Sequence, residues 1–564
     1  MGFVPKWVEQ VAPPDSYRAI FKWGDPSFFK HPNERLYALL KKALNLMDED
    51  FLQPVDLGFE KVEVNIPIKL SKNQLEKLKQ IVGEENVKTD DFSRVKASYG
   101  KTAYDILRLR KKIIENLPDA VVYPRNERDV VELVKYCNEE KIPIYPRGGG
   151  STVTRGTECV KGGICVDFTK HMNKIISVNE VNHTVTVEPG IYGPELEEKL
   201  NNAPKYFGTK HRYTCGHLPQ SFEYSTVGGW VVTRGAGQNS TYYGKIEDLV
   251  VCQKYITPIG EIVTKPYPRA ALGPSIDQIF IGSEGAYGLL VSVTLKIFRY
   301  MPENDQRFSF IFPSFEKALN ACREIMQGQF GFPAVMRLSD PEETDVAMKL
   351  YGVEGTIIDK LIRMKGYKPM ERCLLLGLAQ GEKDFAKNIK RKIMKIAKDF
   401  GGMYTTGYVT KAWEKGRFTD PYIRDDLMDF GIVIDTLECA VAWDQVEYVW
   451  KTVRSFCKQR PNTIVMSHCS HFYPQGTNLY FIFVGKFKDI QEFVEYQSGI
   501  IDSIVKSGAA LSHHHGIGKL FAPWFEECIG TNQLNVMKCL KKYFDPNNIM
   551  NPGGTLGLDL EVKK

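Results

Sequence analysis

Three successive histidines are the stretch of this sequence whose residue types point most directly to chemistry. They lie in the segment Ser512-His513-His514-His515-Gly516-Ile517-Gly518-Lys519. A histidine has a reference pKa of about 6.5, so a cluster of them can take up and release protons beside a reacting centre. If the backbone is extended here, His513 and His515 face one side and His514 faces the other.

A metal site is the alternative interpretation of these histidines. Adjacent side chains cannot easily all aim at one ion, and no acidic residue or cysteine is close in the sequence. The 12 cysteines are scattered and form no Cys-x-x-Cys pair, which argues against an iron–sulfur or structural zinc site. We therefore expect no metal, and cysteines that are buried or free thiols, as in a reducing compartment.

A glycine-rich segment earlier in the chain has the composition of an anion-binding loop, and it consists of Pro146, Arg147, Gly148, Gly149, Gly150, Ser151 and Thr152. Consecutive glycines carry no β-carbon, so backbone N–H groups can approach an anion closely, and the two hydroxyls add donors. The residues suit a diphosphate. The segment matches neither the Walker loop nor the Rossmann fingerprint, and by itself it is equally compatible with a plain loop between strands.

Two further glycine-rich segments follow at a distance that fits one domain. The first contains Gln220, Ser221, Tyr224, Ser225, Thr226, Gly228, Gly229, Thr233, Arg234, Gly235 and Ala236, and the second contains Glu284, Gly285, Gly288 and Leu290. With all three segments in this order, the sequence resembles the vanillyl-alcohol-oxidase/PCMH family of FAD enzymes. In that family the first segment holds the FAD diphosphate and the other two line the isoalloxazine ring and ribityl chain. The resemblance implies FAD, bound non-covalently, at these residues.

The length of 564 residues is too great for one ordinary hydrophobic core, so we expect an α+β protein of several parts. The first is an N-terminal helical extension, residues 1–95, and the second a PCMH-type FAD-binding domain, residues 96–300. A cap domain with an antiparallel sheet follows over residues 301–520. Residues 521–564 form a C-terminal segment that, by the resemblance, returns to the FAD domain.

The FAD domain shows an alternation of strands and helices. Ala120–Tyr123 and Ile142–Tyr145 are predicted strands, and Glu127–Glu140 between them has helical periodicity. Ile246–Val251 and Leu289–Phe298 are predicted as later strands. The pattern is that of a mixed α/β domain.

The cap domain repeats a different unit four times, a strand followed by a helix. The strands are Phe308–Phe312, Cys373–Leu378, Ile432–Glu438 and Leu479–Val484, and the helical segments are one that starts near Phe315, then Lys383–Phe400, Trp443–Gln459 and Asp489–Gly508. This arrangement predicts an antiparallel sheet with helices on one face, carrying the substrate pocket.

The N-terminal extension contains an amphipathic segment, Asn33–Met47, with apolar residues at helical spacing. We expect this helix to pack on its own protein, and attachment to a membrane surface is the alternative.

Composition and charge limit the partners and the location. The net charge is +6 and no basic tract has nucleic-acid character, so no nucleic acid is expected as a partner. No run of about 18 apolar residues predicts a membrane-spanning helix. Met1–Lys6 lacks the apolar core of a signal peptide, and Glu561–Lys564 carries no peroxisomal tripeptide. We expect a cytoplasmic homodimer, with peripheral membrane association as an option.

The histidine segment and Tyr422-Ile423-Arg424-Asp425 narrow the resemblance to the alkylglycerone-phosphate synthase branch of the family. The similarity to this branch covers about residues 90–553. It implies a lipid-like substrate: the acyl chain of acyl-dihydroxyacetone phosphate is exchanged for a fatty alcohol through an adduct at flavin N5. The product is an ether lipid precursor, and no net redox occurs.

The same resemblance implies roles for individual residues. Tyr473 would be the general acid/base, and His513–His515 would assist proton removal from the substrate carbon. Arg424 would bind the substrate phosphate, and Arg337 matches a second required arginine. The sequence departs from the branch at His468, which stands where the branch has an arginine, and His471 adds another imidazole to the substrate-binding region.

Two other classes of function remain compatible with the sequence. In an FAD-linked dehydrogenase or oxidase of a small 2-hydroxy acid or a related alcohol, His471 or one of His513–His515 would take the hydroxyl proton while hydride goes to N5. The third class is a flavin-bound subunit that acts mainly as an electron-transfer partner.

Overall fold

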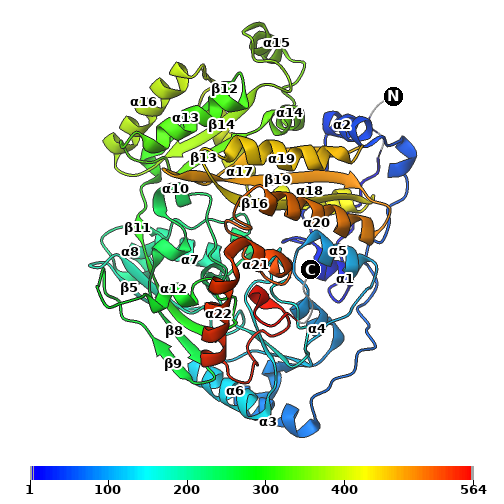
Figure 1. Ribbon diagram of the computed structural model, residues 1–564, viewed down its shortest axis with the longest axis vertical. Helices are drawn as coiled ribbons and strands as arrows, with labels where there is room; N and C mark the ends of the chain where they lie inside the picture. Colours follow the sequence, from blue (N-terminus) through cyan, green and yellow to red (C-terminus); the bar gives the residue numbers. More distant parts are fainter. Residues whose placement is uncertain (1–2, 4, 561–564) are drawn as a thin grey trace.

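The computed structural model of the chain describes Phe3 and residues 5–560. The prediction of no targeting signal concerns two terminal segments. Met1–Lys6 lies partly and Glu561–Lys564 wholly outside the described residues. Helices and strands are mixed along the chain, as the α+β prediction requires (Figure 1). No helix within residues 5–560 combines the length and the apolar character needed to cross a lipid bilayer.

A small sheet carries the first glycine-rich segment. Its strands run in the order β1-β2-β4-β3 and span Val87–Lys88, Ala120–Val122, Ile164–Asp167 and Ile144–Arg147, with β4 parallel to both of its neighbours β2 and β3. Helix α6 (Glu127–Glu140) begins where the Asn126 side chain accepts a hydrogen bond from Asp129 N, and it buries its apolar face against these strands. The predicted helix and both predicted strands around it are therefore confirmed. The glycines follow directly at the end of β3.

A second, antiparallel sheet contains the end of the third glycine-rich segment, where Leu290 lies in strand β10 (Leu289–Lys296). Its order is β5-β6-β10-β8-β9, and the strands span Ile175–Asn179, Thr184–Val187, Leu289–Lys296, Val250–Thr257 and Gly260–Val263. The predicted strand Ile246–Val251 is wrong over most of its length, because helix α11 (Ile246–Leu249) occupies it. The Asp248 carboxylate accepts a hydrogen bond from Lys245 N and closes this helical turn before the strand begins at Val250.

The largest sheet has eight strands, and every pair in it is antiparallel. Its main path is β15-β12-β14-β13-β17-β19-β16, with strands Met403–Tyr404, Gln306–Phe312, Cys373–Ala379, Val335–Ser339, Ile464–Cys469, Gly476–Lys486 and Ile432–Ala442, and β18 (Phe472–Tyr473) pairs with β19. The antiparallel sheet and its four predicted strands are confirmed. Strands β13 and β17 were missed because each carries a polar residue, Arg337 or His468, on the face that looks into the cavity described below.

One face of this sheet is covered by the helices that follow the predicted strands, α13 (Phe315–Gln327), α16 (Lys383–Asp399), α19 (Val446–Gln459) and α20 (Ile490–Lys506). Leu479, Phe481 and Phe483 of β19 belong to that core, whereas Tyr480 and Ile482 point the other way, because side chains alternate along a strand.

The prediction of helices on one face only is wrong. Helices α14 (Pro341–Leu350), α17 (Gly407–Gly416) and α18 (Asp420–Met428) also contact the sheet, and residues of all three line the cavity together with its second face. The prediction failed because these helices are short, and their apolar faces are divided between the cavity and the sheet.

The amphipathic N-terminal segment forms helix α2 (Glu34–Leu44), which begins at the capping side chain of Asn33. Its buried residues Leu36 and Leu40 belong to a cluster with Leu427 and Phe430, which lie in and just after α18. The expectation of a helix packed on its own protein is confirmed for this segment.

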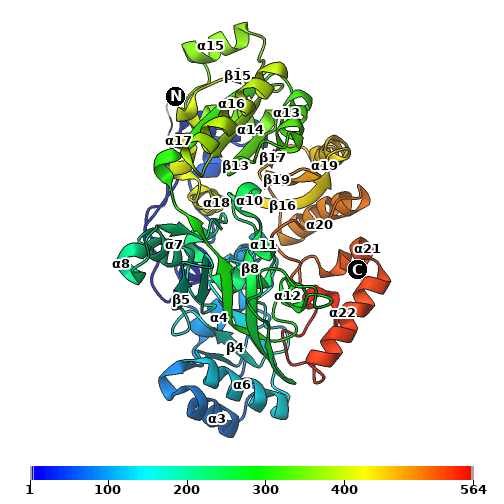
Figure 2. The same ribbon diagram turned by 90° about the vertical axis from the view of Figure 1, so that its left-hand side faces the viewer.

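The C-terminal helices α21 (Ala522–Ile529) and α22 (Thr531–Phe544) lie beside the sheets that carry the glycine segments (Figures 1 and 2). The ring of Phe544 packs 5.0 Å from that of Phe280. After α22 the chain runs beside β3, where Ile144 N donates to Ile549 O at 2.7 Å. The C-terminal segment thus lies against the strand that leads into the first glycine-rich segment.

Candidate functional site

One cavity of about 1100 Å³ joins the glycine-rich segments to the second face of the eight-stranded sheet. All residues that the sequence predicted as cofactor contacts line it, except Tyr224 and Arg234. The predicted substrate-binding residues Arg337, Arg424, His468 and His471 line it as well, as do His514 and His515. Tyr473 and His513 do not.

The glycines allow the three segments to pack against one another. A β-carbon on Gly149 would lie 2.0 Å from the carbonyl oxygen of Tyr224, and one on Gly285 would lie 2.2 Å from Cγ of Pro146. Gly285 also has a φ of +76°, a conformation that favours glycine. These close approaches explain why no larger residue fits, and they bring the backbones of all three segments to one wall of the cavity.

Several buried polar atoms along this wall lack a hydrogen-bond partner among the described residues. They include Nε of Arg147, Oγ1 of Thr157 and Oε1 of Gln238. Buried polar groups in proteins are nearly always paired, so these atoms indicate a polar ligand that completes them. The residues therefore fit a dinucleotide such as FAD, with its hydroxyl, amide and phosphate groups.

Tyr224 and Arg234 were predicted to contact the cofactor, and their side chains point elsewhere. The Tyr224 hydroxyl lies 3.3 Å from that of Tyr422, and Nη2 of Arg234 donates to Oε1 of Gln278. The motif identified the segment, but the direction of each side chain depends on its neighbours. Both residues position the segment and do not line the cavity.

The histidine segment is held by a carboxylate that the sequence analysis missed. Glu438 of β16 accepts hydrogen bonds from Oγ of Ser512 at 2.7 Å and from the backbone N of His513, His514 and His515 at 2.8 to 3.1 Å. Burial alone would raise the pKa of Glu438, but the rings of His514 and His515 hold it well below its usual range. The signal that could have revealed it is a buried carboxylate inside a largely apolar strand.

A second carboxylate ties the same segment to the third glycine-rich segment. Glu284 accepts hydrogen bonds from Ile517 N at 2.6 Å and from Gly518 N at 2.7 Å. Burial raises the pKa of Glu284 to about 7. Its position in the cavity wall agrees with the prediction, and its side chain also fastens the histidine segment to the glycine segments.

The histidine rings form a connected path. The Tyr473 hydroxyl lies 2.7 Å from Nε2 of His513, and Nδ1 of His513 lies 3.0 Å from Nδ1 of His514. Burial, helped by the charge of Lys245, lowers the pKa of His513 well below its ordinary value. Burial likewise lowers the pKa of His515 to about 4. The imidazoles of His513 and His515 are therefore neutral at pH 7.

His471, His513 and His514 each place one ring nitrogen within 4.8 Å of the others. Burial lowers the pKa of His471 well below its ordinary value, and neutral imidazoles are metal ligands. However, Nζ of Lys245 donates to the carbonyl oxygen of His513 at 2.7 Å, and its positive charge disfavours a cation here. The absence of a metal stays a prediction.

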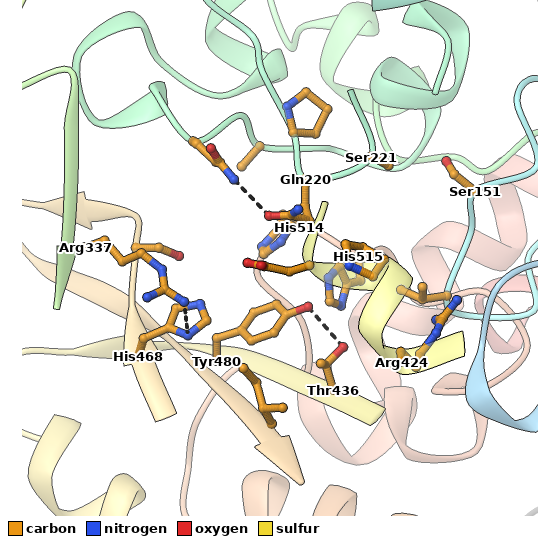
Figure 3. Close-up of a pocket in the computed structure, with 18 of the residues that line it drawn as sticks. Ser151, Gln220, Ser221, Arg337, Arg424, Thr436, His468, Tyr480, His514 and His515 are labelled. Carbon is orange, nitrogen blue, oxygen red and sulfur yellow. Dashed lines mark hydrogen bonds between the residues drawn. The ribbon is translucent and has the colours of Figure 1, made fainter. Parts of the chain in front are cut away.

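Arg337 and His468 share another buried carboxylate that the sequence analysis missed. Nη2 of Arg337 lies 3.1 Å from Nδ1 of His468 (Figure 3). Oε1 of Glu343 lies 2.9 Å from Nη2 of Arg337 and 3.0 Å from Nδ1 of His468. Burial would raise the pKa of Glu343, but Arg337 and His468 hold it at about 2. The His468 ring stacks on Tyr480 at 4.8 Å. Arg337 is therefore already paired.

Arg424 retains binding capacity. On α18, its Nη1 donates to Lys101 O at 2.9 Å and its Nε donates to Oδ1 of Asp425 at 3.2 Å. Nη2 lies 3.2 Å from the same carboxylate oxygen but makes no hydrogen bond with any described residue. Burial also lowers the pKa of the neighbouring Lys101 to about 7. An anion in the cavity would give the Nη2 group of Arg424 the partner it lacks.

Beyond these polar groups the cavity becomes apolar. The side chains there come from α2, α14, α15 (Ile357–Met364), α17, α18 and the sheet, and include Leu36, Leu40, Met348, Leu350, Ile362, Leu374, Leu376, Val409, Ala412, Ile423, Leu427, Ile434, Ile464, Met466, Ile482 and Val484. A lining of this kind favours a hydrocarbon chain over a small hydroxy acid, because apolar walls leave the polar groups of such an acid unpaired.

Comparisons with known proteins agree with this geometry. Residues 118–265 match the family model of the FAD binding domain, and residues 301–555 match that of the C-terminal domain of FAD linked oxidases. An alkyldihydroxyacetonephosphate synthase from Dictyostelium discoideum is 30% identical over 94% of this chain and 92% of its own length. The uncharacterized FAD-linked oxidoreductase YgcU of Escherichia coli (strain K12) is 30% identical over 85% of this chain and 97% of its own. A solved structure of an alkyldihydroxyacetonephosphate synthase superposes with a TM-score of 0.80 at 28% identity, covering 94% of this chain and 98% of that one.

Proposed function

The chain belongs to the family of FAD-linked oxidases, and we propose that it exchanges the acyl chain of acyl-dihydroxyacetone phosphate for a long-chain alcohol. It is an FAD-dependent enzyme. The observation that carries the proposal is the continuity of one cavity, which runs from the glycine segments past the histidines into an apolar chamber. A small hydroxy acid would need no such chamber.

The reaction needs no external oxidant or reductant. In the substrate, the bond between the glycerone carbon and the ester oxygen breaks, and the fatty acid leaves with that oxygen. A new bond forms between the same carbon and the alcohol oxygen, and the alcohol proton is released. When bound, FAD supplies a ring that can exchange a bond with the substrate carbon.

Residues of this chain bind the substrate phosphate and transfer protons. Arg424, whose Nη2 makes no hydrogen bond with a described residue, binds the phosphate, and Arg337, held by Glu343, lines the same cavity. The imidazoles of His514 and His515 accept a proton from the substrate carbon, since both line the cavity. Tyr473 exchanges protons with the site through His513.

The partners follow from the chemistry of the substrate. Both the acyl substrate and the alcohol carry long hydrocarbon chains, so we propose peripheral association with a membrane from which they are taken. The FAD is held without a covalent bond, the enzyme is a cytoplasmic homodimer and no nucleic acid takes part.

The test uses purified, flavin-loaded protein with acyl-dihydroxyacetone phosphate, a long-chain alcohol and no electron acceptor, with products read by mass spectrometry. We expect an alkyl ether and one fatty acid for each turnover. If no ether forms, but hydroxy acids reduce a dye acceptor, the protein is a dehydrogenase and the proposal falls. Failure of both assays would favour a flavin-bound subunit that needs a partner.

A further inference from the structure

Helix α15 presents an apolar face to solvent. Ile357 and Met364 are 76% and 82% exposed, and Ile358 and Leu361 are exposed as well. Their spacing of one, three and four positions puts all four on one side of the helix. Exposed single apolar residues are common, but a contiguous helical face of them indicates an interaction site.

The opposite side anchors α15 to the protein. Asp359 is fully buried and accepts from Nη1 of Arg372 at 2.6 Å. Ile362 packs into a cluster with Met348 and Ile311. These contacts fix the inner face of α15, so its apolar outer face is held in contact with solvent.

The exposed face is continuous with the cavity. Ile358 is exposed and also lines the cavity, and the same holds for Tyr351 after α14 and Tyr408 in α17. Figure 1 shows α15 at the end of the molecule farthest from α3 (Lys72–Val82) and α6, at the tip of the half that contains the large sheet. The apolar chamber therefore reaches the surface at this face.

Positive charge surrounds the apolar face. Lys360, Arg363, Lys365 and Lys368 are all exposed on the same stretch of chain. Asp359 is paired with two arginines and Glu354 with Lys349 at 2.7 Å, and the exposed Glu371 is one further acidic residue beside the four basic ones. An apolar helical face with a basic rim is typical of a helix that lies in the interface of an anionic membrane.

We propose that α15, with Tyr351 and Tyr408, forms a membrane-docking face that seats the mouth of the cavity on an anionic lipid bilayer. A second copy of this chain is a poorer occupant, because two like-charged rims would repel each other. The inference rests on the proposed function in one respect, that the molecule entering the cavity is a lipid. Binding to a bilayer can be measured without any reaction.

The test is co-sedimentation of the full-length, flavin-loaded protein with phosphatidylcholine vesicles that contain or lack phosphatidylserine. The test variant is Ile357→Ser/Leu361→Ser/Met364→Ser, none of which lines the cavity. The matched control is Ile176→Ser/Val181→Ser/Leu272→Ser, which removes three exposed apolar residues elsewhere. We expect at least about tenfold weaker binding for the test variant and no change for the control, since burial of apolar groups drives interfacial binding.

Thermal midpoint and flavin absorbance confirm that both variants are folded. A Lys360→Glu/Lys365→Glu variant should lose the preference for phosphatidylserine. Equal vesicle binding by the test variant and the unaltered protein would overturn the proposal, as would no binding at all. The proposal would also fall if the unaltered protein and the control variant are dimers in sedimentation equilibrium and the test variant is a monomer, because the face would then join two copies.

Activity on a short-chain, water-soluble acyl substrate separates the two proposals. The test variant should retain this activity and lose activity on vesicle-borne substrate. If vesicle binding depends on α15 but no ether is made from either substrate, the docking face stands and the proposed reaction fails.

Discussion

The hydroxyl of Tyr473 and Nε2 of His513 are hydrogen-bonded at 2.7 Å, and neither residue is part of the cavity lining. His514, which does line the cavity, contacts His513 through a ring nitrogen at 3.0 Å. A proton on Tyr473 can therefore reach the cavity through these two imidazoles. This relationship makes Tyr473 a positioning and proton-relay residue in our proposal.

Replacing Tyr473 tests that relay. Tyr473→Phe removes one hydroxyl and should leave the flavin absorbance unchanged while turnover falls by about a hundredfold or more, the usual effect of losing a general acid or base. Stopped-flow and steady-state assays measure it. Tyr496→Phe, which removes a buried hydroxyl bonded to Cys457 O, is the matched control. Full activity in Tyr473→Phe would reject the role.

Nη2 of Arg424, which donates no hydrogen bond to any residue that the structure describes, predicts a selective effect on phosphorylated substrates. Arg424→Ala should raise KM for these by about 10- to 100-fold, because a charge-assisted hydrogen bond contributes about 1.5–3 kcal/mol. Steady-state kinetics with and without the phosphate group measure the difference. Arg391→Ala, in the exposed part of α16, should change nothing. An unaltered KM in Arg424→Ala would sink the assignment.

Gly149 tests the packing of the glycine segments. In Gly149→Ala the new β-carbon would meet Tyr224 O at 2.0 Å, so the segment must shift away from the cavity wall. We expect FAD to bind about 10- to 100-fold more weakly, since such overpacking costs about 1–3 kcal/mol. Flavin titration measures it. In Gly416→Ala the nearest atom is 3.8 Å away, and this control should bind FAD normally.

Buried neutral histidines predict how stability depends on pH. Burial lowers the pKa of His515 to about 4 and that of His217 to about 3, below the value of about 6.5 in the unfolded chain. At pH values between the folded and unfolded pKa of each histidine, the unfolded chain binds more protons than the folded protein. The free energy of unfolding is therefore highest above about pH 6.5 and decreases as the pH drops, by up to about 1.4 kcal/mol per pH unit for each group.

Urea unfolding at a series of pH values measures this slope. His515→Gln should flatten it, and His183→Gln, at a half-buried site elsewhere, should leave it unchanged. A stability that stays constant or increases on acidification would contradict the explanation.

The cluster of His471, His513 and His514 gives a test of the prediction that no metal is needed. Treatment with a chelator should leave activity unchanged, and elemental analysis of the purified enzyme should find no stoichiometric divalent ion. Lys245 supplies the physical reason, because its charge lies against the carbonyl oxygen of His513. A tightly held ion whose removal abolishes activity would show that the three imidazoles form a metal site.

The sequence alone determined the elements that depend on local properties. The helix Glu127–Glu140 follows from its periodicity and its capping Asn126, and the antiparallel sheet follows from four strand–helix units. The glycine segments were recognisable from their residue types and order in the sequence, and close approaches at Gly149 and Gly285 explain two of these glycines. The helices on the second face of the large sheet and the strands β13 and β17 were not predicted. Their residues face both a cavity and a core, and this interrupts the simple apolar pattern.

Only the tertiary structure decided which side chains meet. Glu438 binds the histidine segment across 75 positions of sequence, and Glu284 does so across more than 200. The apolar side of α15 became meaningful only when the structure placed it at the mouth of the cavity, facing solvent. The physical reason is range: turns, caps and periodicity act over a few residues, whereas side-chain direction, burial and pairing depend on segments that folding brings together.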